Sequence, residues 1–211
     1  MTKTFIMCAG KSERYGKSYP KVLEPILGEP NYKRTIRLLK ENGIEAIITV
    51  SKENIQYFDY ENKIIGSNER EIDRFRNIRN YFEKEALILY GDVVYHEADI
   101  KIILNNLFGE INFFGRFLNN FSDDITYGEI LAIHIFNKDK FFNAVDKVAL
   151  NFENKLINRE IGLDVFKELQ MNKTDMSNLS EYTDDFDMIQ KYNSIKELYE
   201  NKIVLCTNIK Q

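Results

Sequence analysis

The sequence has few cysteines, no long apolar run and no dense cluster of basic residues. Its two cysteines, Cys8 and Cys206, lie far apart and lack the spacing of a metal site, which fits a reducing cytoplasm. No stretch of about 18 apolar residues is present, and we recognise no signal peptide, so we expect no contact with a membrane. The net charge of −4, without a basic run, argues against binding to nucleic acid. These absences favour a cytoplasmic protein that binds neither membranes nor nucleic acid.

Strand-like and helix-like segments alternate along the chain, which is the pattern of an α/β fold with a mostly parallel sheet. Hydrophobic residues (44%) and charged residues (29%) have ordinary shares. Without an internal repeat or linker, we expect residues 1–211 to form a single Rossmann-like domain with helices on both faces of the sheet. The expected strands are 4–7, 45–50, 63–65, 86–90, 111–114 and 130–136, and the expected helices are 32–42, 68–82, 141–150, 159–171 and 187–200.

The segment TFIMCAGKSERYGKSYPK, at residues 4–21, carries the most information about function. A short apolar run is followed at once by a glycine-containing loop with four cations: Lys11, Arg14, Lys17 and Lys21. A buried strand that ends in a cationic loop is how α/β folds build phosphate-binding crevices. Glycines let the backbone approach a phosphate closely, and the cations neutralise its charge. We therefore expect this loop to bind phosphate.

The spacing of the loop excludes two common phosphate-binding motifs. A P-loop has four residues between its two glycines, whereas five residues separate Gly10 from Gly16. Pro20 also restricts Tyr19 to an extended conformation, where a P-loop would already be helical. The GxGxxG pattern of dinucleotide-binding folds is absent as well.

The same segment resembles the signature of the nucleotidyltransferases, in which a strand leads into AAG, a basic loop, R-x-G and a P-K pair. The matching parts are Cys8-Ala9-Gly10, Arg14-Tyr15-Gly16 and Pro20-Lys21, followed by VLEPILGEP; Cys8 replaces the usual first alanine, a small-for-small change. The resemblance implies a GT-A-like fold and a nucleoside triphosphate as substrate. It also implies catalytic roles for Arg14 and Lys21, and nucleotide contacts from Cys8, Ala9, Gly10, Lys11, Arg14, Lys21 and Asp92. The alternative is a basic surface loop that only connects a strand to a helix.

Carboxylates in two places are candidate ligands for Mg²⁺, a hard cation that prefers oxygen and usually binds one or two carboxylates plus substrate phosphates. Asp92 follows the predicted strand in ALILYGDVV, where the resemblance implies a magnesium ligand. The C-terminal stretch SEYTDDFDMIQKY supplies Asp184, Asp185 and Asp187 just before a predicted helix. Asp184 aligns best with the second metal ligand of the family, with Asp187 as the alternative. Helix capping is the competing interpretation of these aspartates, and of Asp187 in particular.

Two arginines are candidate contacts for the second substrate. Arg116 lies just after the predicted strand 111–114, in FFGR, and Arg159 begins the predicted helix in NREIGLD. The resemblance implies that a small phosphorylated acceptor attacks the α-phosphate of the triphosphate and releases pyrophosphate, with Lys11 and Arg14 holding the β- and γ-phosphates. Positioning and electrostatics then supply most of the rate.

The sequence leaves the nucleobase, the acceptor and the oligomeric state open. Small members of the family without a second domain favour CTP, and the chain looks like cytidylyltransferases of capsule biosynthesis, including the type that acts on phosphoglutamine. Two other classes remain: a GT-A glycosyltransferase and a non-catalytic nucleotide-binding module. The glycosyltransferase would carry Asp-x-Asp at the strand end, whereas Asp92 is followed by Val93 and Val94.

Overall fold

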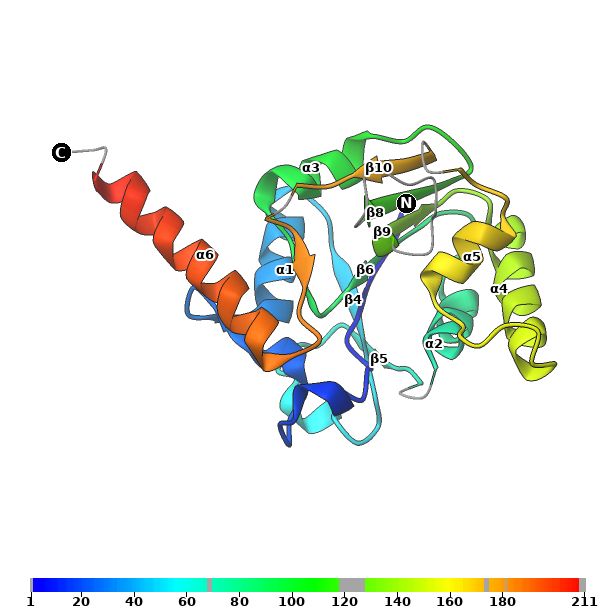
Figure 1. The fold of residues 1–211 in the computed structure, drawn as a ribbon, viewed down its shortest axis with the longest axis horizontal. Helices are drawn as coiled ribbons and strands as arrows, with labels where there is room; N and C mark the ends of the chain where they lie inside the picture. Colours follow the sequence, from blue (N-terminus) through cyan, green and yellow to red (C-terminus); the bar gives the residue numbers. More distant parts are fainter. Residues whose placement is uncertain (1, 68–69, 118–127, 173–174, 181, 209–211) are drawn as a thin grey trace.

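A seven-stranded sheet forms the centre of the computed structural model, which describes residues 2–67, 70–117, 128–172, 175–180 and 182–208. The strand order is β10-β8-β9-β6-β1-β4-β5. Within this sheet β9 is antiparallel to both of its neighbours, and the other pairs are parallel (Figure 1). The strands are β1 (Lys3–Met7), β4 (Ala46–Val50), β5 (Lys63–Ile65), β6 (Ala86–Tyr90), β8 (Ile111–Phe117), β9 (Gly128–Ile135) and β10 (Met176–Asn178).

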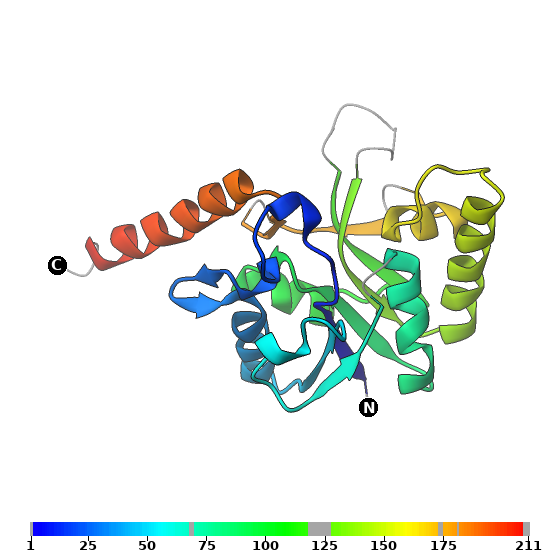
Figure 2. The ribbon, with the colours of Figure 1, turned by 90° about the horizontal axis from the view of Figure 1, so that it is seen from below.

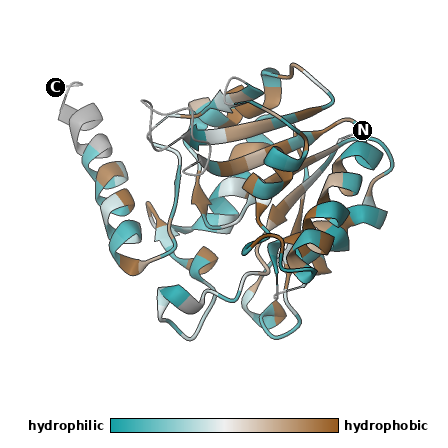
Figure 3. Ribbon diagram, turned by 45° about the vertical axis from the view of Figure 1, so that its right-hand side comes forward, coloured by the Kyte–Doolittle hydropathy of each residue, from teal (hydrophilic) through white to brown (hydrophobic). Residues whose placement is uncertain are grey.

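Helices cover both faces of the sheet because its central strands are apolar on both sides. Helices α1 (Asn31–Glu41) and α3 (Glu97–Asn105) pack on one face, and α2 (Glu71–Ile78), α4 (Lys138–Glu153) and α5 (Gly162–Glu168) pack on the other. Side chains alternate along a strand, so Ile6 of β1 faces α1 and α3, whereas Phe5 and Met7 face the other layer. The brown strands in Figure 3 lie between helices whose outer sides are teal.

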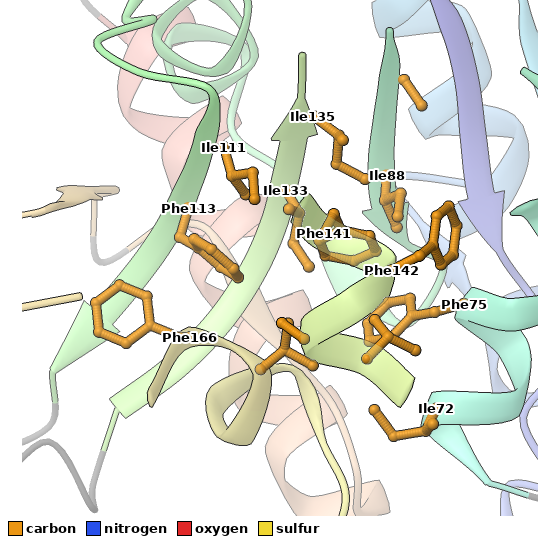
Figure 4. Close-up of a cluster of buried hydrophobic side chains, with 14 of the residues drawn as sticks. Ile72, Phe75, Ile88, Ile111, Phe113, Ile133, Ile135, Phe141, Phe142 and Phe166 are labelled. Carbon is orange, nitrogen blue, oxygen red and sulfur yellow. The ribbon is translucent and has the colours of Figure 1, made fainter. Parts of the chain in front are cut away.

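The larger core lies under α2, α4 and α5 and is rich in aromatic rings (Figure 4). Phe75 of α2 and Phe141 of α4 meet edge to face, with ring centroids 5.6 Å apart. Phe166 of α5 makes a similar contact with Phe113 of β8, at 5.1 Å. Such pairs add to the stabilisation from burial, and here one joins α2 to α4 and the other joins α5 to β8.

The predicted α/β fold with a mostly parallel sheet and helices on both faces is confirmed, with differences in detail. Strands 63–65 and 86–90 were predicted with their observed bounds, and the predicted helix 141–150 is the middle of α4. The predicted helix 159–171 is shorter, and α3 and β10 were not predicted. Of the predicted helix 68–82, residues 68–69 lie outside the described residues, and α2 is followed by a 3₁₀ turn at Arg79–Tyr81.

Smaller elements complete the fold beside the sheet. The loop after β1 contains the 3₁₀ turns η1 (Glu13–Tyr15) and η2 (Lys21–Leu23), and a short hairpin of β2 (Pro25–Ile26) and β3 (Glu29–Pro30) precedes α1. Strand β7 (Val93–Val94) pairs with β11 (Asp184–Asp185). Between β4 and β5 lies the 3₁₀ turn η3 (Ile55–Tyr57).

Helix α6 (Ile189–Asn208) begins beside the loop after β1 and extends away from the body of the protein (Figures 1 and 2). Its N-terminal part, up to Tyr199, buries Tyr192, Ile195 and Tyr199 in a small separate core that also contains Tyr15 and Phe186. The start of α6 is therefore fixed to the N-terminal loop by aromatic packing. None of the helices in the described ranges has the length and apolar character needed to span a membrane.

Candidate functional site

A cavity of about 520 Å³ opens where β1 and β6 end. Its wall contains residues of the N-terminal loop (Gly10, Lys11, Ser12, Arg14 and Lys21), and residues from the end of β6 and from the segment before α6 (Tyr90, Asp92, Asp185 and Asp187). The carboxyl ends of the strands in an open α/β sheet are where such folds bind ligands. The cavity combines cations and carboxylates, so it can bind phosphate groups and a metal ion together.

The ends of β1 and β6 approach each other closely, and Gly91 makes this approach possible. The amide of Gly91 donates a hydrogen bond to the carbonyl of Met7 at 3.0 Å. A Cβ atom at position 91 would lie 2.8 Å from that carbonyl oxygen and 2.8 Å from Sγ of Cys8, closer than packed atoms allow. Cys8 and Ala9 are themselves buried, and burial raises the pKa of the Cys8 thiol, so Cys8 is uncharged and serves as a small packing residue.

The N-terminal loop is folded by local turns and anchored to the C-terminal segment. Ser12 and Gly16, on either side of η1, both have left-handed backbone conformations, with φ of 56° and 76°. The Ser12 hydroxyl accepts a hydrogen bond from the amide of Lys21 at 3.2 Å. Between these points, the buried ring of Tyr15 packs against Phe186 and Tyr192. The loop cations are therefore held in place before any ligand binds.

Lys21 joins two carboxylates that are far apart in the sequence. Its Nζ lies 2.6 Å from Asp92 and 2.5 Å from Asp187, and Arg14 lies 2.5 Å from the other oxygen of Asp187. Burial alone would lower the pKa of Lys21, but the two carboxylates raise it further than burial lowers it. Burial likewise favours a higher pKa for Asp92, yet Lys21 holds that pKa below its ordinary value. Lys21 and Asp92 are thus both charged at neutral pH.

The pairing of β7 with β11 decides which C-terminal aspartate reaches the cavity. Val94 lies opposite Asp184 in this ladder, and the amide of Phe186 donates to the carbonyl of Asp92 at 3.1 Å. Because side chains alternate along an extended segment, Phe186 is buried in the core beside α6, whereas Asp185 and Asp187 line the cavity. The structure therefore brings Asp92 together with Asp187, the alternative partner in the sequence prediction, and not with Asp184.

Asp184 belongs to a second group of charges at the rim of the cavity. It lies 2.5 Å from Arg116 and 2.9 Å from Lys191, and Lys191 also pairs with Asp185. Oxygen atoms of Glu129, Asp184 and Asp185 lie within 4.8 Å of one another, but each of these carboxylates already forms an ion pair with Arg116, with Lys191 or with both. Burial raises the pKa of Asp185 to about 6 in spite of Lys191. This group connects β8, β9 and β11 with the start of α6.

The two arginines predicted to contact an acceptor have partners in the protein instead. Arg116 pairs with Glu129 and Asp184, and the guanidinium of Arg159 lies 3.4 Å from Asp164. Arg159 lines a separate hollow beside α4 and α5. Among the described residues that line the main cavity, neither arginine is present. Their predicted role therefore has no support from the geometry, because ion pairs hold both of them outside the cavity wall.

Several cavity residues were missed by the sequence analysis because nothing in their local sequence marks them. Glu71, in the first turn of α2, accepts hydrogen bonds from the Tyr90 hydroxyl at 2.7 Å and from the amide of Gly162 at 2.8 Å. Burial raises the pKa of Glu71. Arg74 and Glu129 also line the cavity. An acidic residue in a first turn is an ordinary feature of helices, so only the tertiary structure shows that Glu71 faces the cavity.

The fit of a magnesium ion can be judged from the carboxylates of the cavity. Asp92 and Asp187 come from different segments, and one oxygen of each lies within 2.6 Å of the same Lys21 nitrogen. Two carboxylate oxygens that already converge on one positive charge are a suitable ligand set for Mg²⁺, which completes its coordination with water and substrate phosphate. The residues present therefore fit the metal, and they would be Asp92 and Asp187.

Solved structures with the same fold were found, although no protein-family model and no curated protein sequence matches the chain. The inositol-1-phosphate CTP transferase from T. maritima is 14% identical, with a TM-score of 0.62 over 95% of this chain and 96% of its own. A putative glucose-1-phosphate thymidylyltransferase from Bacillus anthracis is 12% identical, with a TM-score of 0.63 over 94% of this chain and 95% of its own. At these identities the likeness establishes the fold, over nearly the full length of all three chains.

Proposed function

We propose that the chain is a magnesium-dependent nucleotidyltransferase that transfers a nucleoside monophosphate from a nucleoside triphosphate to a small phosphorylated acceptor. The observation that carries this proposal is the convergence of Asp92 and Asp187 on Lys21, beside the cationic loop at the carboxyl end of β1. The fold shared with two nucleotidyltransferases supports it. A basic loop without a role in binding would not need carboxylates from two distant segments in front of it.

Each charged side chain has a defined part in this reaction. Arg14 and Lys11 bind the β- and γ-phosphates, and the exposed Arg14 can offer a guanidinium fork to a phosphate. Lys21 binds oxygens of the α-phosphate and stabilises the charge that develops there in the transition state. Asp92 and Asp187 would hold Mg²⁺, which neutralises phosphate charge and polarises the α-phosphorus when bound. The backbone of Cys8, Ala9 and Gly10 lies against the nucleotide.

The transfer needs no nucleophilic side chain. An anionic oxygen of the acceptor phosphate forms a bond to the α-phosphorus, the bond from the α-phosphorus to the bridging oxygen breaks, and pyrophosphate leaves with the electron pair. The attacking oxygen carries no proton that a general base must remove. This agrees with the cavity, where the nearest thiol, Cys8, is buried and held uncharged. The protein contributes position and electrostatic stabilisation.

CTP is the triphosphate that we favour, with a precursor of capsule or surface polysaccharide as the product. The resemblance of this compact chain to small cytidylyltransferases supports CTP, as does the match to a protein described as a CTP transferase. Sugar phosphates, alditol phosphates, phosphocholine and phosphoglutamine are the acceptors to compare, and phosphoglutamine is the specific candidate. Reaction in the cytoplasm, where CTP is made, fits this proposal.

A matrix of substrates tests the proposal directly. Pyrophosphate release is measured for each of the four nucleoside triphosphates with each acceptor, with Mg²⁺ and with a chelator in its place. We expect release for at least one pair, faster with CTP and abolished by the chelator. If the triphosphate binds but no pair yields pyrophosphate, the chain is a non-catalytic nucleotide-binding module. Consumption of a nucleotide-sugar without pyrophosphate release would identify a glycosyltransferase instead.

A further inference from the structure

Arg74 of α2 lies on the cavity wall beside the start of the N-terminal loop. One terminal nitrogen of its guanidinium lies 3.4 Å from the point where a Cβ atom of Gly10 would be. Gly10 is the first glycine of the loop expected to bind phosphate. The half-buried Arg74 side chain therefore reaches from the helix layer across the end of β1, and its charge faces the same space as Lys11 and Arg14.

The guanidinium of Arg74 is the exception among the arginines of the described residues. Within the described ranges, the Arg74 side chain forms no hydrogen bond and no ion pair within 4 Å. Every other arginine there binds an acidic side chain or a backbone carbonyl: Arg14, Arg34, Arg37, Arg70, Arg76, Arg79, Arg116 and Arg159. Its Nε is also buried without a hydrogen-bond acceptor. A desolvated guanidinium nitrogen without a partner is costly.

Glu71, one helical turn before Arg74 on α2, does not serve as its partner. Both hydrogen bonds to the Glu71 carboxylate come from Tyr90 and Gly162. The positive charge of Arg74 influences nearby carboxyl groups electrostatically. It helps to lower the pKa of Asp92, and it opposes the rise in the pKa of Glu71. The guanidinium thus raises the positive potential beside the two carboxylates expected to bind Mg²⁺, and it has donors free for an anion.

We propose that Arg74 is a binding residue for a substrate phosphate. A guanidinium offers paired N–H donors that match two oxygens of one phosphate group. The anion would satisfy the donors that the protein leaves without a partner, and it would lie in the cavity beside both Arg74 and the N-terminal loop. This inference rests on the proposed function, in that the cavity receives phosphorylated substrates. The phosphate can belong to the triphosphate or to the acceptor, and the experiment separates the two.

Binding measurements that need no turnover test the role of Arg74. Tripolyphosphate with Mg²⁺ stands for the triphosphate, and inorganic phosphate stands for the acceptor phosphate; both are titrated into the wild type and into R74Q, R74K and R76Q by calorimetry. Arg76 is the matched control because it lies on the same helix and pairs with Asp146 outside the cavity, at 3.0 Å. We expect R74Q to lose affinity by roughly ten- to hundred-fold for one probe, since hydrogen bonds to charged groups have that weight.

The outcomes separate this inference from the proposed function. A loss for tripolyphosphate assigns Arg74 to the triphosphate, and a loss for inorganic phosphate alone assigns it to the acceptor. The affinity of R74K should lie between those of the wild type and R74Q, because lysine keeps the charge but not the paired donors of a guanidinium. The affinity of R76Q should equal that of the wild type. Unchanged affinities in R74Q, or a wild type that binds neither probe, would overturn the proposal. If both probes bind and depend on Arg74 but no pyrophosphate is ever released, only the proposed reaction fails.

Discussion

Replacement of Asp187 by Asn separates the two possible partners of Asp92 and is the sharpest test of the site. The change keeps the shape of the side chain and removes its charge. Two cations lose a partner, but neither is left buried and unpaired: Lys21 keeps Asp92 at 2.6 Å, and the Arg14 side chain is 75% exposed. Partly exposed ion pairs contribute on the order of 1 kcal/mol or less to stability. We therefore expect D187N to fold, with a melting temperature close to that of the wild type.

The effect of D187N on catalysis should be much larger than its effect on stability. An amide oxygen is a neutral and weaker ligand for Mg²⁺ than a carboxylate, and Lys21 would also lose one of the two groups that position it. Loss of one preorganised electrostatic contact in such a site costs on the order of a hundred-fold or more in rate. The Mg²⁺ concentration for half-maximal rate should rise as well.

The assay is pyrophosphate release over a titration of Mg²⁺, with D184N as the matched control. Asp184 lies three positions away, but its partner Arg116 keeps Glu129 at 3.1 Å and Lys191 keeps Asp185. We expect D184N to retain turnover and Mg²⁺ dependence close to those of the wild type. If D184N loses turnover while D187N keeps the turnover of the wild type, the geometry of this segment is wrong. If neither substitution changes turnover or its Mg²⁺ dependence, the assignment of a paired-carboxylate site is wrong.

Three further predictions concern Lys21, Gly91 and Asp185. Lys21→Ala should lower turnover on the order of a hundred-fold and leave a folded protein by circular dichroism; near-normal turnover would refute its role. Gly91→Ala should destabilise the fold by about 1–3 kcal/mol in urea unfolding, because the new Cβ would lie 2.8 Å from Sγ of Cys8; an unchanged midpoint would contradict this. Because burial raises the pKa of Asp185 to about 6, the folded protein holds more protons there than the unfolded chain, so its stability should fall as pH rises from about 4 to about 6. D185N should lack this part of the pH dependence, and identical profiles for D185N and wild type would rule out the shift.

The local sequence was sufficient for the class of fold and for the position of the site along the chain. Strands such as 86–90 are continuous apolar runs, and such a run indicates a strand that is buried on both faces of a parallel sheet. The proximity of the cationic loop after β1 to Asp92 after β6 could also be predicted, because the carboxyl ends of parallel strands lie at the same edge of a sheet. The antiparallel direction of β9 was not predicted, since the direction of a strand leaves no local signal in its sequence. Helix α3 was not predicted either.

Tertiary structure alone decided which side chains meet at the site. Asp184, Asp185 and Asp187 are the same type of residue, so their chemistry does not distinguish them as metal ligands. A shift of one residue in an extended segment also reverses the face on which each side chain lies. The ladder between β7 and β11, together with the burial of Phe186, fixes that register and brings Asp187 to Lys21. The sequence by itself therefore determined that carboxylates and cations meet at the end of this sheet. Which of them touch depends on a pairing between segments some ninety residues apart, because such contacts are set by packing and not by neighbours in the chain.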